Sequence, residues 1–194
     1  MADTARSEKI ITPRARLSFP NLLQPRSYNG GALKYSCTLI FPAGTDITVL
    51  QNAAGNVALE QWPKGLPPNL RNPFRDAREK EGIDGYNAGD IFISCSSLNP
   101  PGIVGPDART PLTTRKDIYP GCWVVASVVA FAYDTKGNKG VSFGLNNIQK
   151  VADDTPLGSF SRPEDDFEAV EDTSQVEAEE AKLAGASPTA VFKA

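Results

Sequence analysis

Arginine and lysine side chains recur on the polar faces of two predicted strands near the N-terminus. In residues 10–20 ("IITPRARLSFP") apolar and polar side chains alternate, which places Arg14 and Arg16 on the polar face. Residues 33–41 ("LKYSCTLIF") repeat the alternation with Lys34 on the polar face. Cations that follow the surface of a sheet neutralise the phosphates of a nucleic acid strand. The pattern therefore predicts a polyanion-binding face on these two strands.

An aromatic side chain stands on the polar face of a third predicted strand, residues 90–97 ("DIFISCSS"). The alternation turns Ile91, Ile93 and Cys95 inward. Phe92 is then left outward among serines. An exposed ring stacks on an unpaired base with a gain of about 1–3 kcal/mol, whereas the bases of a duplex are already stacked. Phe92 is therefore predicted to contact single-stranded nucleic acid; the alternative is that a loop or helix covers its ring.

Further basic and aromatic side chains lie in a long loop and at a hairpin tip. Residues 99–121 are too rich in proline and glycine to be regular, and long loops inside compact domains often carry function. The segment "TKGNKG" at 135–140 predicts a tight turn between two strands. The complete set of candidate binding residues is Arg14, Arg16, Lys34, Phe92, Arg115, Lys116, Tyr119, Tyr133, Lys136 and Lys139.

Residue types that most enzymes need are missing or scattered. The chain has no histidine, which removes the commonest general base, the Ser/His and Cys/His pairs and every His-containing metal site. Cys37, Cys95 and Cys122 stand apart in apolar surroundings, which predicts buried thiols. We expect no catalytic residue, no metal and no cofactor. A nuclease that uses Asp or Glu with a divalent metal is the weaker alternative.

Five predicted strands and one helix make up the body of the chain. Apolar residues alternate along the strands, which favours an antiparallel sheet or barrel. The helix is predicted from about residue 45, with Thr45 or Asp46 as its cap, and a short charged helix is predicted in residues 74–82. The fold class is therefore mainly β, an OB-fold-like five-stranded antiparallel barrel with one helix between strands.

Two of these strands have predicted apolar faces. The first strand is predicted to turn Ile11, Ala15, Leu17 and Phe19 toward the core. The fourth strand, near residues 122–134, has a face of small residues that suits a narrow barrel interior, made of Val124, Ala126, Val128, Ala130 and Ala132.

Charge divides the chain into a basic body and an acidic end. Residues 1–152 hold 17 Lys+Arg and 12 Asp+Glu, whereas residues 153–194 hold 3 and 11. The segment "PEDDFEAVEDTSQVEAEEAK" at 163–182 has too few apolar residues to offset the entropy of ordering. We expect residues 1–9 to be a flexible N-terminus, residues 10–160 to be the binding domain and residues 161–194 to be a disordered acidic tail that competes with a polyanionic ligand.

Residues 119–151 ("YPGCWVVASVVAFAYDTKGNKGVSFGLNNIQKV") resemble a family of bacteriophage single-stranded-DNA-binding proteins. Supporting pieces are "YSCTLIFPAGTDI" at 35–47, "NPFRDARE" at 72–79 and "PLGS" at 156–159. The resemblance covers nearly all of residues 10–160. It implies an OB fold that binds single-stranded DNA with little sequence preference, followed by an acidic tail.

The resemblance also implies a place and partners for the protein. It implies a non-enzymatic role in phage DNA replication or recombination, in the cytoplasm of the infected bacterial host, with phage or host replication proteins as candidate partners of the tail. The sequence itself predicts neither a signal peptide nor a membrane span, because the longest apolar run ("CWVVASVVAFAY") is about half the length that a span needs. A protein–protein interaction module that uses the barrel faces without DNA is the alternative function.

Overall fold

The computed structural model describes residues 4–27, 30–135 and 137–158 of the chain. Lys136 and the predicted acidic tail lie outside these described residues. The elements follow in the order β1 (Ile10–Ile11), β2 (Ala15–Arg26), β3 (Lys34–Phe41), α1 (Thr48–Gln61), β4 (Arg75–Asp76), the 3-10 helix η1 (Ala77–Lys80), β5 (Ile91–Ser97), β6 (Gly102–Val104), β7 (Trp123–Thr135) and β8 (Asn138–Ala152).

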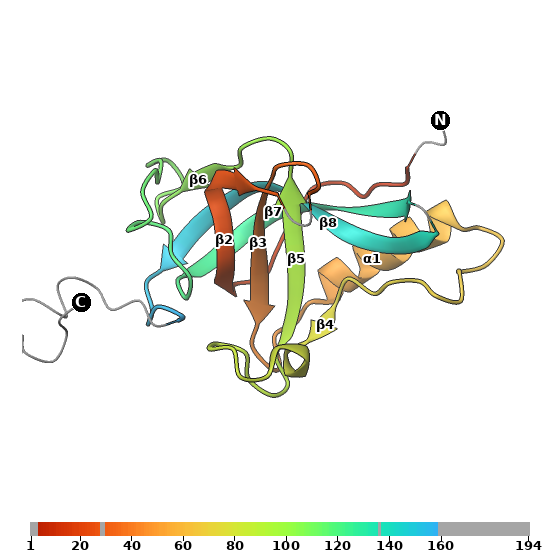
Figure 1. Ribbon diagram of the computed structural model, residues 1–194, viewed down its shortest axis with the longest axis horizontal. Coiled ribbons are helices and arrows are strands. Elements are labelled where there is room, and N and C mark those ends of the chain that lie inside the picture. The colour runs from red at the N-terminus through yellow and green to blue at the C-terminus, as the bar shows by residue number, and fades with distance from the viewer. Residues whose placement is uncertain (1–3, 28–29, 136, 159–194) are drawn as a thin grey trace, which may run out of the picture. The chain divides into compact units, whose positions relative to one another are not determined.

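Five long strands close into a barrel in the order β2, β3, β5, β8 and β7, and β7 pairs again with β2 (Figure 1). All pairings around this ring are antiparallel except that of β5 with β8, which is parallel and sets Cys95 opposite Phe143. The short strands add to the ring, β1 beside β7, β4 beside β5 and β6 beside β8. The predicted five-stranded barrel is confirmed, but the pairing of β5 with β8 is parallel where the prediction was antiparallel throughout.

The interior of the barrel is filled by the inward faces of all five strands. The small-residue face of β7 is at most 1% exposed at every position, as predicted. Larger side chains from the facing strands, such as Leu39, Phe41 and Phe143, fill the space that these small residues leave. The three cysteines are buried, as predicted. A hydrogen bond with Cys37, together with burial, raises the pKa of the Cys95 thiol well above its ordinary value.

Helix α1 follows β3 and packs against β7 and β8 (Figure 1). The N-cap position is occupied by Ile47, so neither predicted cap, Thr45 or Asp46, is the N-cap residue. Asp46 nevertheless accepts a hydrogen bond from the Thr48 N–H at 2.9 Å. Hydrogen bonds from the Thr48 side chain and from the Thr48 N–H lower the pKa of the Asp46 carboxyl group. The helix buries a stripe of apolar residues against the core. As predicted, this stripe includes Leu50, Ala54, Val57 and Ala58.

The first predicted strand is divided at Pro13, which cannot donate a ladder hydrogen bond. On the N-terminal side of this break the two faces are exchanged. Ile11 is 61% exposed, whereas Thr12 is buried and its Oγ1 accepts a hydrogen bond from the Ala126 N–H. The prediction that Ile11 faces the core is therefore wrong.

A second exchange of faces occurs inside β2. Ala15 and Leu17 are fully buried as predicted, but Ser18 is also buried and Phe19 is 48% exposed. Phe19 has a φ of 45°, and the register of β2 on β3 shifts immediately after Ser18. This bulge turns the Phe19 ring out of the barrel, so the prediction that it faces the core is wrong.

The structure differs from the sequence predictions in three smaller respects. Residues 5–7, expected to be flexible, are hydrogen bonded along β7, for example from the Ser7 N–H to the Ala130 carbonyl oxygen at 2.9 Å. The segment 74–82 forms β4 and the single turn of η1 in place of one charged helix. The long loop at 99–121 contains β6.

Candidate nucleic-acid interface

A shallow cavity of about 220 Å³ lies on the outer face of the barrel, over β3, β5 and β8. Most of its lining is hydroxyl-bearing, and we call it the hydroxyl groove, defined by Ser36, Thr38, Ser94, Ser96 and Ser142. Phe19 forms one edge of this groove. Side chains this small leave the strand surface accessible, and each hydroxyl can donate and accept hydrogen bonds.

Strand register explains why these hydroxyl groups share one surface. Ser18 stands opposite Thr38, and Thr38 stands opposite Ser94. The parallel pairing of β5 with β8 continues the row to Ser142, whose partner on β7 is Phe131. Since alternate residues of a strand point to opposite faces, the row runs across the outside of the barrel while its neighbours fill the core.

Phe19 combines exposure with a strained backbone. A positive φ is uncommon for any residue with a Cβ and costs on the order of 1–3 kcal/mol. Asn21 Nδ2 donates a hydrogen bond to the Phe19 carbonyl oxygen at 3.3 Å and thereby helps to hold the bulge. The Tyr86 ring lies 6.4 Å from the Phe19 ring, measured between centroids. The surrounding contacts therefore fix an aromatic ring at the edge of the hydroxyl groove.

A single lysine lies among three aromatic rings beside this edge. Lys80 Nζ is 4.4 Å from the centroid of the Phe19 ring and 4.8 Å from the centroids of both Tyr86 and Phe92. Lys80 Nζ also donates a hydrogen bond to the Tyr86 hydroxyl at 3.1 Å, and that hydroxyl donates to Ser18 Oγ at 3.1 Å. The cation is thus positioned beside the groove by contacts from three separate segments.

Phe92 faces outward from the barrel, as predicted, but its ring is not accessible to a ligand. Its ring is 0% exposed and belongs to a small outer cluster with Ile40 and Leu157, against which Tyr86 packs. Arg75 lies over the same ring at 5.2 Å. The prediction that Phe92 is exposed for stacking is wrong because the 77–90 segment and Leu157 cover it.

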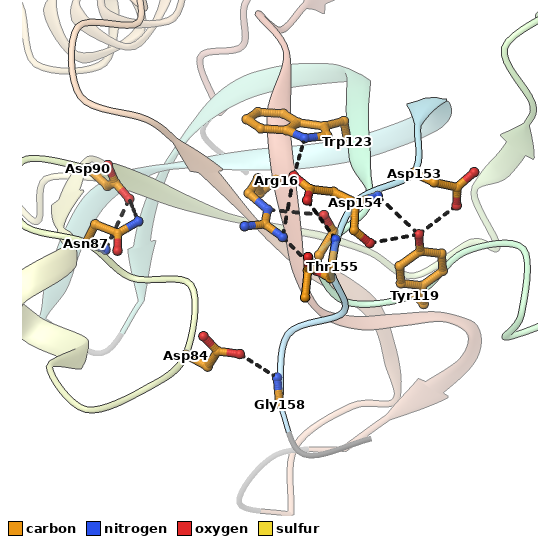
Figure 2. Close-up of polar contacts among 11 residues, drawn as sticks. Arg16, Asp84, Asn87, Asp90, Tyr119, Trp123, Asp153, Asp154, Thr155 and Gly158 are labelled. Carbon is orange, nitrogen blue, oxygen red and sulfur yellow. Dashed lines mark hydrogen bonds and ion pairs between the residues drawn. The ribbon is translucent and has the colours of Figure 1, made fainter. Parts of the chain in front are cut away.

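Residues 153–158, which we call the strap, run across the outer face of β2 and β7 (Figure 2). Arg16 Nη2 donates to the Thr155 carbonyl oxygen at 2.7 Å, and its guanidinium lies 3.7 Å from the Asp154 carboxylate. Trp123 Nε1 donates to the same carboxylate at 2.7 Å. Hydrogen bonds from the Thr155 N–H and Trp123, together with nearby Arg16, lower the pKa of Asp154.

The far end of the strap is also fixed in place. The Leu157 N–H donates to the Pro120 carbonyl oxygen at 2.9 Å. The Gly158 N–H donates to Asp84 at 3.0 Å (Figure 2). A Cβ on Gly121 would meet the Thr155 carbonyl oxygen at 2.3 Å, so glycine is required where the strap crosses. The strap therefore covers the face on which Arg16 lies.

Tyr119 is bound to the strap as well. Its hydroxyl donates to Asp153 at 2.6 Å (Figure 2). Lys150 Nζ forms an ion pair with the same carboxylate at 2.7 Å. Burial and the hydrogen bond to Asp153 raise the pKa of Tyr119. The strap thus brings together Arg16 and Tyr119, two of the predicted binding residues. Their partners in this structure are carboxylate and carbonyl groups of the chain itself.

The remaining candidates are dispersed over the surface. Arg14 is exposed, with its guanidinium 4.7 Å from the Trp123 ring centroid, and Lys34 is exposed at the start of β3. Arg115 and Lys116 lie exposed in the loop before β7, where Arg115 contacts Gln24 at 3.5 Å.

Tyr133 and Lys139 lie at the tip of the β7–β8 hairpin, at its opposite end from Trp123, and Lys139 pairs with Asp134 at 3.1 Å. Ten residue steps along β7 separate Trp123 from Tyr133, roughly 33 Å. The structure therefore does not gather the predicted residues into one site.

The sequence predictions missed three residues at the groove edge, Phe19, Lys80 and Tyr86. Phe19 was assigned to the core by its period, although Pro20 and Asn21 directly after it are unusual inside a strand. Lys80 and Tyr86 lie in a segment dense in charges and turns that has no strand period. The serines beside Phe92 on β5, Ser94 and Ser96, were correctly placed outward by alternation.

Within residues 4–27, 30–135 and 137–158 the structure shows no group of three or more Cys, Asp or Glu side chains placed to hold a metal ion. No helix in the described part of the chain has the length and apolar character to cross a membrane.

A closed five-stranded barrel with one parallel pairing and a polar groove on its outer face defines an OB-fold domain. The chain belongs to the family described as the single-stranded-DNA-binding protein of Enterobacter phage Enc34, whose sequence model matches residues 8–179. The chain is also 34% identical over 159 residues to "putative protein p50" of Acyrthosiphon pisum secondary endosymbiont phage 1, across 75% of this chain and 84% of that protein.

Solved structures of phage proteins share the fold. The single-stranded DNA-binding protein of bacteriophage Enc34, in complex with single-stranded DNA, aligns with a TM-score of 0.65 and 23% identity over 77% of this chain and 89% of that one. The single-stranded DNA-binding protein gp2.5 of bacteriophage T7 aligns with a TM-score of 0.54 and 13% identity over 84% and 99%. At these identities the likeness concerns the fold.

Proposed function

We propose that the protein binds single-stranded DNA with little sequence preference and coats transient single strands during phage DNA replication or recombination, in the cytoplasm of the infected host. The observation that carries this proposal is the hydroxyl groove, which has an exposed ring and a fixed lysine at its edge. Family membership supports it, as does the DNA complex of the Enc34 protein.

The chemistry of the groove favours a single strand over a duplex. Unpaired bases expose their faces to a ring such as Phe19, whereas phosphates and sugars can approach small hydroxyl side chains closely. None of the five groove hydroxyls belongs to a long side chain that would read base edges. This composition supports binding with little sequence preference.

The acidic residues 161–194 have a proposed role as an internal competitor. The body carries an excess of basic residues and the C-terminal segment an excess of acidic ones, so the segment is an anion tethered to a cationic surface. DNA displaces it from the cations beside the groove. The displaced segment is then available to phage or host replication proteins, which we propose as its partners.

A charge placed on the floor of the groove tests the proposal. Ser94 is exposed on the floor, so Ser94→Glu introduces a carboxylate where the strand is expected to lie without filling the core. Asn52→Glu, on the exposed face of α1, adds the same charge elsewhere. Fluorescence polarisation with labelled oligo-dT should show at least about a 10-fold loss for Ser94→Glu, since like charges near a protein surface repel by a few kcal/mol.

Asn52→Glu should bind nearly as the parent protein does. Equal affinities for the parent and Ser94→Glu would show that DNA does not occupy the groove. Incubation of the same oligonucleotide with the protein and Mg²⁺ should leave it intact, whereas metal-dependent cleavage would support the nuclease alternative.

A further inference from the structure

The bulge at Phe19 moves an aromatic ring from the core side of β2 to the surface. Phe19 has the same strand parity as Ala15 and Leu17, both of which are 0% exposed. Regular alternation would have buried the ring with them. In the structure Phe19 is 48% exposed and its backbone is strained, so folding gains neither the burial of the ring nor the preferred φ. Strain of this kind, held in place by its surroundings, is typical of binding sites.

The surroundings of the Phe19 ring suit a nucleotide. The ring lies at the edge of the hydroxyl groove, so a base that follows the groove reaches its accessible surface. Lys80 Nζ, 4.4 Å from the ring centroid, places a positive charge within reach of a phosphate adjoining that base. Half-buried Ser36 and exposed Ser94 line the groove and offer hydroxyl groups to the sugar and phosphate.

Lys80 and Tyr86 are fixed by contacts that reach outside their own segment. The Asp90 carboxylate accepts hydrogen bonds from the Ala43 and Asn87 N–H groups at 3.0 and 3.1 Å and thereby closes the turn before β5. Leu157 of the strap packs on the cluster that Tyr86 joins. The cation and the ring at the groove edge are therefore positioned before any ligand arrives.

We propose that Phe19 and Lys80 form a nucleotide subsite at the β2 edge of the hydroxyl groove, in which the Phe19 ring stacks on an unpaired base and the Lys80 ammonium binds the adjacent phosphate. This inference rests on the proposed function and specifies which residues contact the strand. It also replaces Phe92, which the sequence suggested as the stacking residue, by a ring on a different strand.

The test compares oligo-dT with an abasic oligonucleotide of the same length, both fluorescein-labelled. Phe19→Asn removes the ring but retains a residue type that tolerates a positive φ, and Val49→Ala on α1 is the control at a side chain of matched exposure, 49% against 48%. The parent protein should prefer oligo-dT over the abasic strand. Phe19→Asn should weaken oligo-dT binding by roughly 5- to 150-fold, the range that stacking on one ring supplies.

The same variant should leave binding of the abasic strand nearly unchanged, because that strand has no base to stack. Lys80→Met should weaken both strands alike, since both carry phosphates. Val49→Ala should change neither affinity. An unchanged oligo-dT affinity in Phe19→Asn, with the parent binding well, would overturn the subsite and leave the proposed function standing. Failure of the parent itself to bind oligo-dT would instead overturn the proposed function.

A fluorescence reporter keeps the subsite testable if Phe19→Asn folds poorly. Phe19→Trp retains a stacking ring and adds a third indole to the two of the parent protein, Trp62 and Trp123. Oligo-dT should quench the Phe19→Trp protein by more than it quenches the parent, because a stacked base quenches the new indole. Equal quenching in the two proteins would contradict stacking at this position.

Discussion

The hydroxyl groove and the strap-covered face lie on the same barrel and differ in what occupies their polar groups. In the groove, Ser94 is exposed and the Phe19 ring is half exposed. On the other face, the Arg16 guanidinium binds the Thr155 carbonyl oxygen and lies beside the Asp154 carboxylate. An outward-facing basic or aromatic residue is therefore not necessarily available to a ligand, because other residues of the chain can occupy its side chain.

The largest effect is expected from a substitution that removes the strap from its face. Leu157→Asp places a carboxylate in the outer cluster, where Leu157 is 8% exposed between Tyr86, Phe92 and Ile40. The free energy of unfolding should fall by about 3 kcal/mol or more, because apolar burial is lost and an unpaired charge is added. Urea denaturation followed by circular dichroism measures the change, and Leu66→Asp, at a side chain that is 52% exposed, is the control. Similar losses in both variants would mean that the strap adds little to the fold.

Deletion of residues 163–194 should have the next largest effect, on DNA binding at low salt. The deletion removes far more acidic than basic residues, so affinity for oligo-dT should rise several-fold at low ionic strength. At physiological salt, a Debye length of about 8 Å screens most of the difference. Polarisation titrations of both forms at two salt concentrations check this. A fall in affinity would place part of the DNA site in the deleted segment.

Salt dependence separates the cations of the two regions. If Lys80 neutralises one phosphate, Lys80→Met should make the log–log slope of affinity against salt shallower by about 0.7. Arg16→Met should leave the slope nearly unchanged, because the partners of Arg16 are Thr155, Gly121 and Asp154. Titrations of oligo-dT over a salt series measure both slopes. A slope change in Arg16→Met that matches Lys80→Met would mean that the strap opens when DNA binds.

The smallest predicted effect is a pH dependence of the strap. The pKa of Asp154 is lowered in the folded protein, chiefly by hydrogen bonds from the Thr155 N–H and Trp123. Its contribution to stability is therefore fully present above the unfolded pKa of about 4 and is lost as pH falls through the folded value. The emission of Trp123, whose indole N–H is bonded to this carboxylate at 2.7 Å, should change in that acid window. Asp154→Asn should remove this component, and an identical acid transition in both proteins would refute the assignment.

Strand periodicity predicted the side of the barrel for most residues of the site. The inward small face of β7 and the outward serines of β5 follow directly from alternation. Alternation carries no information about what lies over an outward residue, and Phe92 is covered by Tyr86 and Leu157, which come from distant segments.

Periodicity also cannot predict where a strand departs from it. Phe19 was assigned to the wrong face because the bulge reverses the two faces of β2. The bulge places a positive φ at a phenylalanine, a residue type that does not signal such a conformation in the sequence. Lys80 has no period to follow, because it lies in a single helical turn that is fixed by contacts with Phe19, Tyr86 and Phe92.

The parallel pairing of β5 with β8 has a consequence for how the chain is made. During synthesis β2, β3, β4 and β5 emerge first and can pair as neighbours. The edge of β5 at Cys95 and Ser96 nevertheless stays open until residues near Phe143 leave the ribosome. Open strand edges are sites of misassociation, and pairings distant in sequence form slowly. Nascent chains stalled before β8 should therefore be sensitive to proteases and prone to aggregate, whereas chains extended past the strap should be resistant.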